Sequence, residues 1–158
     1  MNCADARLLV VDDDLLVRRC LSRVLRRQGF ERIDQAEDGA EAFSRFLERP
    51  YDVVITDWKM PRATGLDLLH LIRSNGERHL TPVLVLTAED TAEHELEARW
   101  GGANGFFAKP HAVLSLAVEV KRLLQAAPAG PGHTDCTPGG HVSQPPPHAA
   151  SSAAHRPR

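Results

Sequence analysis

The feature that most constrains the fold is a regular alternation between short runs suited to strands and longer segments of helical periodicity. The short runs are 8–11, 32–36, 52–56, 82–87 and 105–108. Apolar residues recur at helical spacing in the segments that follow, at about 15–25, 40–47, 66–72, 91–100 and 111–125. Gly29 stands where a glycine would end the first helix. Strands that alternate with helices predict an α/β fold with a parallel sheet.

The polarity of the runs predicts the order of the strands. Runs 8–11, 52–56 and 82–87 are almost wholly apolar, as expected for central strands with helices on both faces. Run 32–36 is polar and run 105–108 is short, as expected at the sheet edges. With right-handed crossovers, this favours the flavodoxin-like (βα)5 doubly wound sheet of order 2-1-3-4-5, a three-layer sandwich. No glycine-rich dinucleotide or P-loop motif follows the first strand, which disfavours those nucleotide-binding folds.

Composition changes near residue 128 and indicates the limits of the domain. Segment 128–158 has no Leu, Ile, Phe, Trp or Tyr and is rich in Pro, Gly, His and Ala. Such a segment cannot bury enough apolar surface to offset the entropy of ordering. We therefore expect one domain at 1–127 and a disordered tail at 128–158.

Charge and cysteine content exclude several classes of function. The chain has 19 Lys and Arg against 21 Asp and Glu, so no basic surplus favours nucleic acid as a partner. No apolar run approaches the ~18 residues of a membrane span, and the N-terminus lacks the pattern of a signal peptide. The cysteines, Cys3, Cys20 and Cys136, are few and far apart, which favours reduced thiols and a cytoplasmic location.

Polar residues gather where the predicted strands end. These residues are Asp12, Asp13 and Asp14 after the first strand, Asp57 after the third, Thr87 and Ala88 at the fourth, and Lys109 and Pro110 at the fifth. In an open parallel sheet, ligands bind at the carboxyl ends of the strands, beside the point where strand order reverses. We therefore expect these residues to form one site.

The chemistry of this site is restricted by its charges. Neighbouring carboxylates repel one another unless they share a proton or hold a cation, and oxygen ligands suit Mg²⁺. An ionised Asp57 needs no general base to attack phosphorus, and the product would be an acyl phosphate. Lys109 and the Thr87 hydroxyl are placed to offset charge on the transferred oxygens. Asp14 suits the N-cap of the first helix better than a ligand role.

The same residues resemble the motifs of the receiver domain of two-component response regulators. The resemblance covers about 8–125 and rests on Val11-Asp12-Asp13, Asp57-Trp58-Lys59-Met60-Pro61 with Gly65, Thr87-Ala88 and Lys109-Pro110. It implies that Asp57 accepts a phosphoryl group from a sensor histidine kinase or a histidine phosphotransfer protein. It also implies Mg²⁺ bound directly by Asp13, Asp57 and the main-chain carbonyl of Lys59, with Asp12 acting mainly through water.

The resemblance further implies a switch. Thr87 and Ala88 would meet the phosphoryl group, Phe106 would be the aromatic residue that turns inward, and Lys109-Pro110 would be a cis peptide. Trp58, Lys59 and Glu89 would modulate the lifetime of the acyl phosphate. Output would be a changed affinity for a downstream protein at the face made by the fourth helix, fifth strand and fifth helix. Apart from its own phosphorylation and slow dephosphorylation, no enzymatic activity is expected.

Two alternatives remain open at this stage. A Mg²⁺-dependent phosphatase with an aspartyl-phosphate intermediate would use an Asp-x-Asp pattern after the first strand, which Asp12 and Asp14 formally satisfy. It would leave Asp57 unexplained. A phosphorylation-independent interaction module would keep the fold but lose an acidic residue, the threonine or the lysine, and none is lost here.

Overall fold

A computed structural model describes residues 2–88, 91–109 and 112–126, with the side chains of 112–114 left undescribed. The strands are β1 (Arg7–Val11), β2 (Arg32–Ala36), β3 (Val53–Asp57), β4 (Val83–Thr87) and β5 (Gly105–Ala108). The helices are α1 (Leu15–Arg27), α2 (Gly39–Glu48), α3 (Gly65–Arg73), α4 (Ala92–Trp100) and α5 (Ala112–Ala126). Strands and helices alternate along the described chain as expected, and the third strand lies one residue later than the predicted 52–56.

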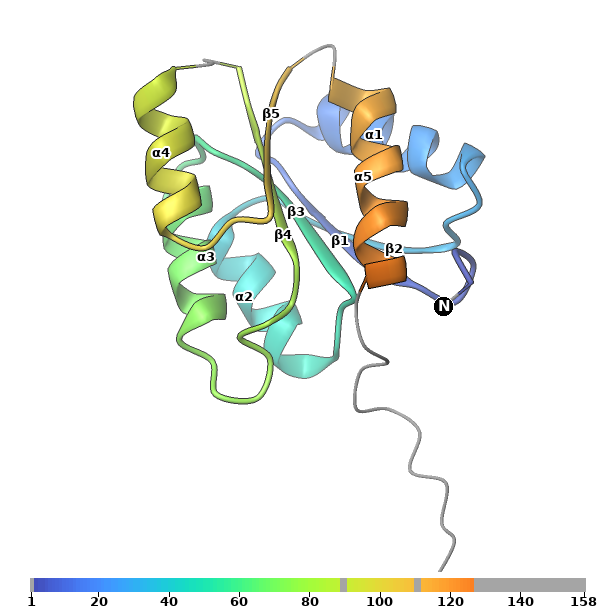
Figure 1. The fold of residues 1–158 in the computed structure, drawn as a ribbon, viewed down its shortest axis with the longest axis horizontal. Coiled ribbons are helices and arrows are strands. Elements are labelled where there is room, and N and C mark those ends of the chain that lie inside the picture. Colours follow the sequence, from blue (N-terminus) through green and yellow to red (C-terminus); the bar gives the residue numbers. More distant parts are fainter. Residues whose placement is uncertain (1, 89–90, 110–111, 127–158) are drawn as a thin grey trace, which may run out of the picture.

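The five strands form one sheet in the order β2-β1-β3-β4-β5, and every neighbouring pair is parallel. The predicted doubly wound, flavodoxin-like order is therefore confirmed. Helices cover both faces of the sheet and make the outer two of three layers (Figure 1). The register pairs Asp57 with Leu86 and Thr87 with Ala108, so β3, β4 and β5 end close to one another.

Alternate side chains of the central strands enter two separate cores. On the face covered by α1 and α5, Leu8 and Ile55 pack in a cluster with side chains of both helices. On the opposite face, Leu9 and Val54 pack in a cluster with side chains of α2 and α3. Because both faces are covered, the central strands are apolar throughout, as the sequence predicted.

Caps fix where the helices begin and end. The Asp14 carboxylate accepts a hydrogen bond from the main-chain N–H of Leu16 at 2.7 Å, which confirms its predicted N-cap role. Gly29, with φ +94°, ends α1 in the left-handed conformation that glycine adopts at little cost. At the start of α3, Thr64 and Asp67 form a reciprocal capping box.

Some predictions fall on residues outside the described ranges. These are the modulator role of Glu89, the cis peptide at Pro110 and the tail at 128–158, all of which stay predictions, as does the domain limit at 127. Across the described ranges, the helices are all too short or too polar to cross a bilayer.

Candidate functional site

Three acidic side chains meet at the carboxyl edge of the sheet. Asp12 and Asp13 directly follow β1, and Asp57 is the last residue of the neighbouring strand β3. Each of the three offers one carboxylate oxygen, and these oxygens all lie within 4.8 Å of one another. These three aspartates therefore meet at the carboxyl edge of the sheet, as the sequence predicted.

Asp57, the last residue of β3, is buried, with only 7% of its surface exposed. One of its carboxylate oxygens, Oδ1, lies 2.9 Å from the ammonium of Lys109. Burial raises the pKa of the Asp57 carboxyl above its usual value, and Lys109 opposes that rise by stabilising the ionised form. The lysine thus favours the ionised form of this buried carboxylate.

Lys109 bridges two of the three acids. Its ammonium donates to Asp12 Oδ2 at 2.5 Å as well as contacting Asp57, and its main-chain N–H donates to the Thr87 carbonyl at 2.7 Å. Burial alone would lower the pKa of Lys109, but its hydrogen bonds to both carboxylates outweigh this and raise it. The ammonium is therefore held charged between Asp12 and Asp57.

The three aspartates that follow β1 differ in their burial and in their contacts. Asp12 is almost fully buried, and its Oδ1 accepts the main-chain N–H of Asp14 at 2.9 Å. Asp13 is exposed, so its carboxylate borders the solvent side of the group. Asp14 turns its carboxylate to the N-terminus of α1 and is not one of the three grouped acids. Its engagement there weakens the phosphatase alternative, which needs Asp14 for catalysis.

The loop after β3 is held closely against the end of the sheet. The Trp58 main-chain N–H donates to the Leu86 carbonyl at 2.7 Å, and the Gly65 N–H donates to the Trp58 carbonyl at 3.0 Å. A Cβ atom on Gly65 would lie 2.2 Å from the carbonyl oxygen of Asp57, so only glycine fits. Lys59 lies on this loop with an exposed side chain, and the role of its carbonyl as a metal ligand stays a prediction.

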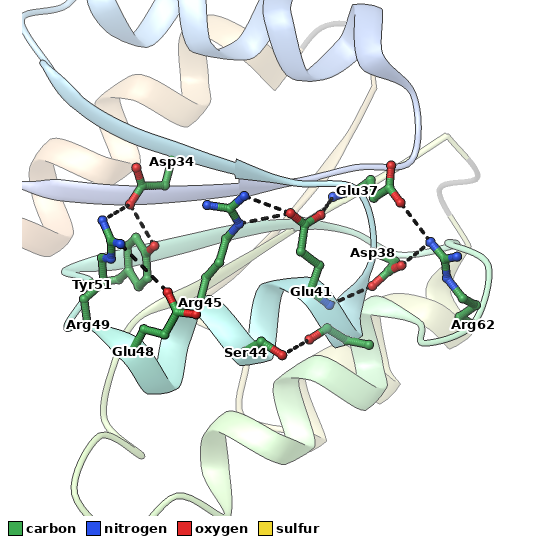
Figure 2. Close-up of polar contacts among 11 residues, drawn as sticks. Asp34, Glu37, Asp38, Glu41, Ser44, Arg45, Glu48, Arg49, Tyr51 and Arg62 are labelled. Carbon is green, nitrogen blue, oxygen red and sulfur yellow. Dashed lines mark hydrogen bonds and ion pairs between the residues drawn. The ribbon is translucent and has the colours of Figure 1, made fainter.

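A second set of contacts ties the same loop to the start of α2 (Figure 2). The Arg62 guanidinium pairs with the buried Asp38 carboxylate and, at 3.1 Å, with Glu37. Arg62 itself has φ +69°, a left-handed conformation that is strained for a residue with a side chain. The Gly39 N–H adds a hydrogen bond to the Ala63 carbonyl at 3.3 Å.

Aromatic contacts connect the loop after β3 with β5 and α4. Trp58 is buried and meets the Phe106 ring edge-on, with 6.1 Å between ring centroids. On its other side, Trp58 lies 5.3 Å from the His94 ring of α4. Thr87, buried at the end of β4, and the exposed Ala88 complete the edge. Phe106 is half-buried, and its role as a switch stays a prediction.

Sequence reasoning missed three residues that bear on this site. Arg18 donates from Nη1 to the main-chain carbonyl of Asp12 at 2.5 Å, Arg62 anchors the loop after β3, and His94 packs on Trp58. The spacing of Arg18, one turn into a helix that starts beside Asp12, was an available signal. Arg62 and His94 carry no such signal, because their partners lie in other elements.

Comparisons with known proteins agree with the fold and identify the family that the chain resembles in sequence. The sequence model of the response regulator receiver domain matches residues 8–121. The chemotaxis protein CheY-3 of Vibrio cholerae is 36% identical over 119 residues, 75% of this chain and 92% of that protein. CheY of Pseudomonas aeruginosa is 34% identical, again over 75% of this chain and 96% of that protein.

Solved structures of chemotaxis and receiver-domain proteins have the same fold as this chain. The structure of V. cholerae chemotaxis protein CheY4 superposes with a TM-score of 0.69 at 32% identity, covering 75% of this chain and 98% of that one. A signal receiver domain of a signal transduction histidine kinase from Syntrophus aciditrophicus gives a TM-score of 0.73 at 26% identity. That match covers 82% of this chain and 97% of the other.

Proposed function

Because this chain belongs to the response regulator receiver domain family of two-component signalling, we propose that Asp57 is its phosphoacceptor. The phosphodonor would be a phosphohistidine on a sensor histidine kinase or a histidine phosphotransfer protein. The observation that carries the proposal is the group of three acids within 4.8 Å, with the Lys109 ammonium 2.9 Å from the Asp57 carboxylate. No role in core packing or helix capping accounts for that arrangement.

The residues of the site fit a magnesium ion. Asp12, Asp13 and Asp57 supply only carboxylate oxygens, the donors that Mg²⁺ prefers. The Lys109 ammonium pairs with two of the three carboxylates, so the group keeps a surplus of negative charge that a dication would neutralise. When bound, the metal would neutralise charge on the transferred phosphoryl group. We propose Asp13 and Asp57 as direct ligands with the Lys59 carbonyl, and Asp12 as a partner through water.

The transfer step follows from the ionised state of Asp57. A carboxylate oxygen of Asp57 forms a bond to phosphorus while the bond from phosphorus to the donor imidazole nitrogen breaks. The electron pair of the broken bond stays on the imidazole, so the chain needs no general base. The Lys109 ammonium already contacts the Asp57 carboxylate and would pair with an oxygen of the transferred phosphoryl group. The Thr87 hydroxyl, at the end of the neighbouring strand, would donate to another. Hydrolysis of the acyl phosphate then restores the carboxylate.

Output would leave the site through the aromatic contacts. Trp58 joins the phosphoacceptor strand to Phe106 of β5 and to His94 of α4. A shift at Asp57 is therefore passed to the face made by α4, β5 and α5, where we place a downstream protein target. In this proposal, the protein acts as a cytoplasmic signalling switch and has no activity on a separate substrate.

The test is labelling with acetyl phosphate, followed by intact mass, with Mg²⁺ and with a chelator. We expect the wild-type chain to gain one phosphoryl group only when Mg²⁺ is present. Asp57→Asn should abolish the gain, and the matched variant Asp5→Asn, an exposed acid before β1, should retain it. Labelling that survives Asp57→Asn, or that proceeds equally without Mg²⁺, would overturn the proposal.

The same samples distinguish the alternatives. Turnover of small phosphate esters that is lost in Asp12→Asn but kept in Asp57→Asn would favour a phosphatase. A chain that takes up no phosphoryl group from acetyl phosphate, and that beryllofluoride with Mg²⁺ leaves unchanged in Trp58 fluorescence, would favour a phosphorylation-independent interaction module.

A further inference from the structure

A groove rich in arginine lies away from the acidic site, between α1 and the edge strand β2. It has a volume of about 490 Å³, and its lining residues are Arg19, Ser22, Arg23, Arg26, Arg27 and Gln35. It is shallow and open to solvent, so it suits the side of another macromolecule better than an enclosed small molecule. Two of its lining side chains are hydrogen-bonded, because the Gln35 amide donates to the buried Ser22 hydroxyl at 2.9 Å.

Three of the four groove arginines have side chains that make no contact serving the fold of the described chain, whereas Arg26 donates to the Glu31 carbonyl at 3.3 Å. The side chains of Arg19, Arg23 and Arg27 make no hydrogen bond or ion pair with any other residue of the described ranges, and α1 contains no acid. These three lie four residues apart on one helix, where like charges repel and destabilise it. Arg27, in the last turn, gains from the helix dipole, but Arg19 and Arg23 do not. Their charge is therefore uncompensated within this structure.

The spacing of the arginines points to the form of a partner. At a rise of ~1.5 Å per residue, the backbone positions of Arg19, Arg23 and Arg27 are spaced about 6 Å apart along the helix axis, over about 12 Å in all. An acidic helix with carboxylates at positions i, i+4 and i+8 has the same spacing. Guanidinium groups pair with carboxylates through two parallel hydrogen bonds, which gives such a match direction as well as charge.

Other occupants fit less well. Without the four groove arginines, the chain keeps 15 of its 19 basic residues against 21 acidic ones, so a long polyanion such as nucleic acid would meet repulsion beyond the stripe. The chain's own segment 127–158 contains a single acid, Asp135. We infer that the groove between α1 and β2 docks an acidic helix of a partner protein, a property that goes beyond the proposed phosphoacceptor function and does not depend on it.

The experiment measures binding of a defined probe to the full chain. The probe is a fluorescent alanine-rich peptide of about 16 residues, long enough for partial helicity, with Glu at positions i, i+4 and i+8. The comparison peptide has the same composition with its Glu residues spread around the helix. We expect fluorescence anisotropy at low salt to show several-fold tighter binding of the aligned peptide, and binding to weaken as salt is added.

Matched variants assign that binding to the groove. The double variant Arg19→Gln with Arg23→Gln should weaken binding of the aligned peptide about tenfold, because two charged contacts are lost. The control Arg49→Gln with Arg99→Gln removes two exposed arginines elsewhere, at the same net charge, and should bind as the wild type does. Both doubles should keep labelling of Asp57 by acetyl phosphate, which separates this test from that of the proposed function.

Each other outcome overturns the inference. Equal binding of the two peptides, or equal weakening in both double variants, would indicate general attraction between opposite charges. Tighter binding of a single-stranded oligonucleotide than of the aligned peptide would make nucleic acid the occupant. Self-association of the wild type that is lost in the Arg19 and Arg23 variant would make a second copy, through its exposed Glu93 and Glu97, the occupant.

Discussion

At the scale of single residues, Gly65 is the position where the site tolerates least change. An added Cβ would lie 2.2 Å from the Asp57 carbonyl oxygen, against backbone whose movement would shift the phosphoacceptor. We expect Gly65→Ala to lower the free energy of unfolding by roughly 1–3 kcal/mol, the usual cost of overpacking. Urea denaturation measures the loss, and acetyl phosphate labelling should slow as well.

The control for this prediction is Gly76→Ala. A Cβ at Gly76 would have no other atom within 4 Å, so this variant should change stability little or raise it slightly. If both glycine variants lose the same stability, the close approach to Asp57 is not the cause.

Asp57 carries a cost in stability that can be measured apart from its chemistry. Burial raises the pKa of its carboxyl in the folded protein, with Lys109 acting in the opposite direction. A carboxyl with a raised pKa binds its proton more tightly when folded. Folding stability is therefore lost as the pH rises from the unfolded pKa through the folded pKa of Asp57. The full penalty is present once the pH lies above the folded pKa.

We expect Asp57→Asn, without Mg²⁺, to raise the melting temperature at neutral pH, because asparagine avoids the cost of a buried charge. The gain should shrink as the pH falls below the folded pKa of Asp57, where the wild-type carboxyl is also neutral. Calorimetry from neutral pH down to about pH 3 covers this window. The exposed Asp5→Asn should show no such gain, and a gain in Asp57→Asn that is constant with pH would contradict the burial argument.

At the scale of elements, the loop between β3 and α3 depends on a contact from α2. Arg62 pairs with Asp38 at the N-cap of α2 and with Glu37, and it holds a strained φ of +69° to do so (Figure 2). This loop carries Lys59, whose carbonyl we propose as a metal ligand. Arg62 is therefore a positioning residue for the magnesium site, acting through the backbone of its own loop.

We expect Arg62→Gly to weaken Mg²⁺ binding by several-fold while changing thermal stability little, because glycine relieves the strain as the ion pair is lost. A titration of Trp58 fluorescence with Mg²⁺ measures the affinity. Arg62→Lys, which keeps the charge, should recover part of it. Mg²⁺ affinity that is unchanged in Arg62→Gly would remove the positioning role.

The sequence predicted the secondary structure correctly where the local residue pattern favours the same structure as the tertiary fold. The apolar runs of β1, β3 and β4 reflect burial on both faces, and that burial fixed their central place in the sheet. The meeting of Asp12, Asp13 and Asp57 followed from strand order, since parallel strands end at one edge. Local signals also located the Asp14 cap and Gly29.

The rest depends on contacts between elements distant in sequence. Nothing in the sequence indicates that an arginine at position 62 takes a left-handed backbone, since Gly, Asn and Asp are the usual residues there. His94 on Trp58, and Arg73 bound to the carbonyls of Gly102 and Thr81, depend equally on tertiary packing. β3 starts at residue 53, one residue later than predicted. The Asp52 carboxylate accepts the main-chain N–H of Arg7, the first residue of β1, at 2.8 Å, and this contact lies just before the strand begins.

At the scale of the whole molecule, the helices are attached with unequal strength. The helices α3 and α4 have nine residues each, which makes them a matched pair within one chain. Leu68, Leu69 and Ile72 anchor α3 in a large core, whereas Ala98 is the one buried residue of α4 in its described length. Trp100 of α4 is 80% exposed. The helix α4, which is part of the proposed output face, thus has less apolar burial to lose on opening than α3.

Local opening costs less where little apolar surface is buried, so we expect amides of α4 to exchange with deuterium at least about tenfold faster than those of α3. Beryllofluoride with Mg²⁺, as a phosphoryl mimic, should alter protection in α4 and β5 more than in α3, because Trp58 contacts His94 and Phe106. Hydrogen-exchange mass spectrometry resolves both helices in one sample. Equal exchange in α3 and α4 would contradict the weak attachment of α4. If the effect of the mimic is lost in Asp57→Asn but in the wild type spreads evenly over the sheet, the aromatic route to α4 is contradicted.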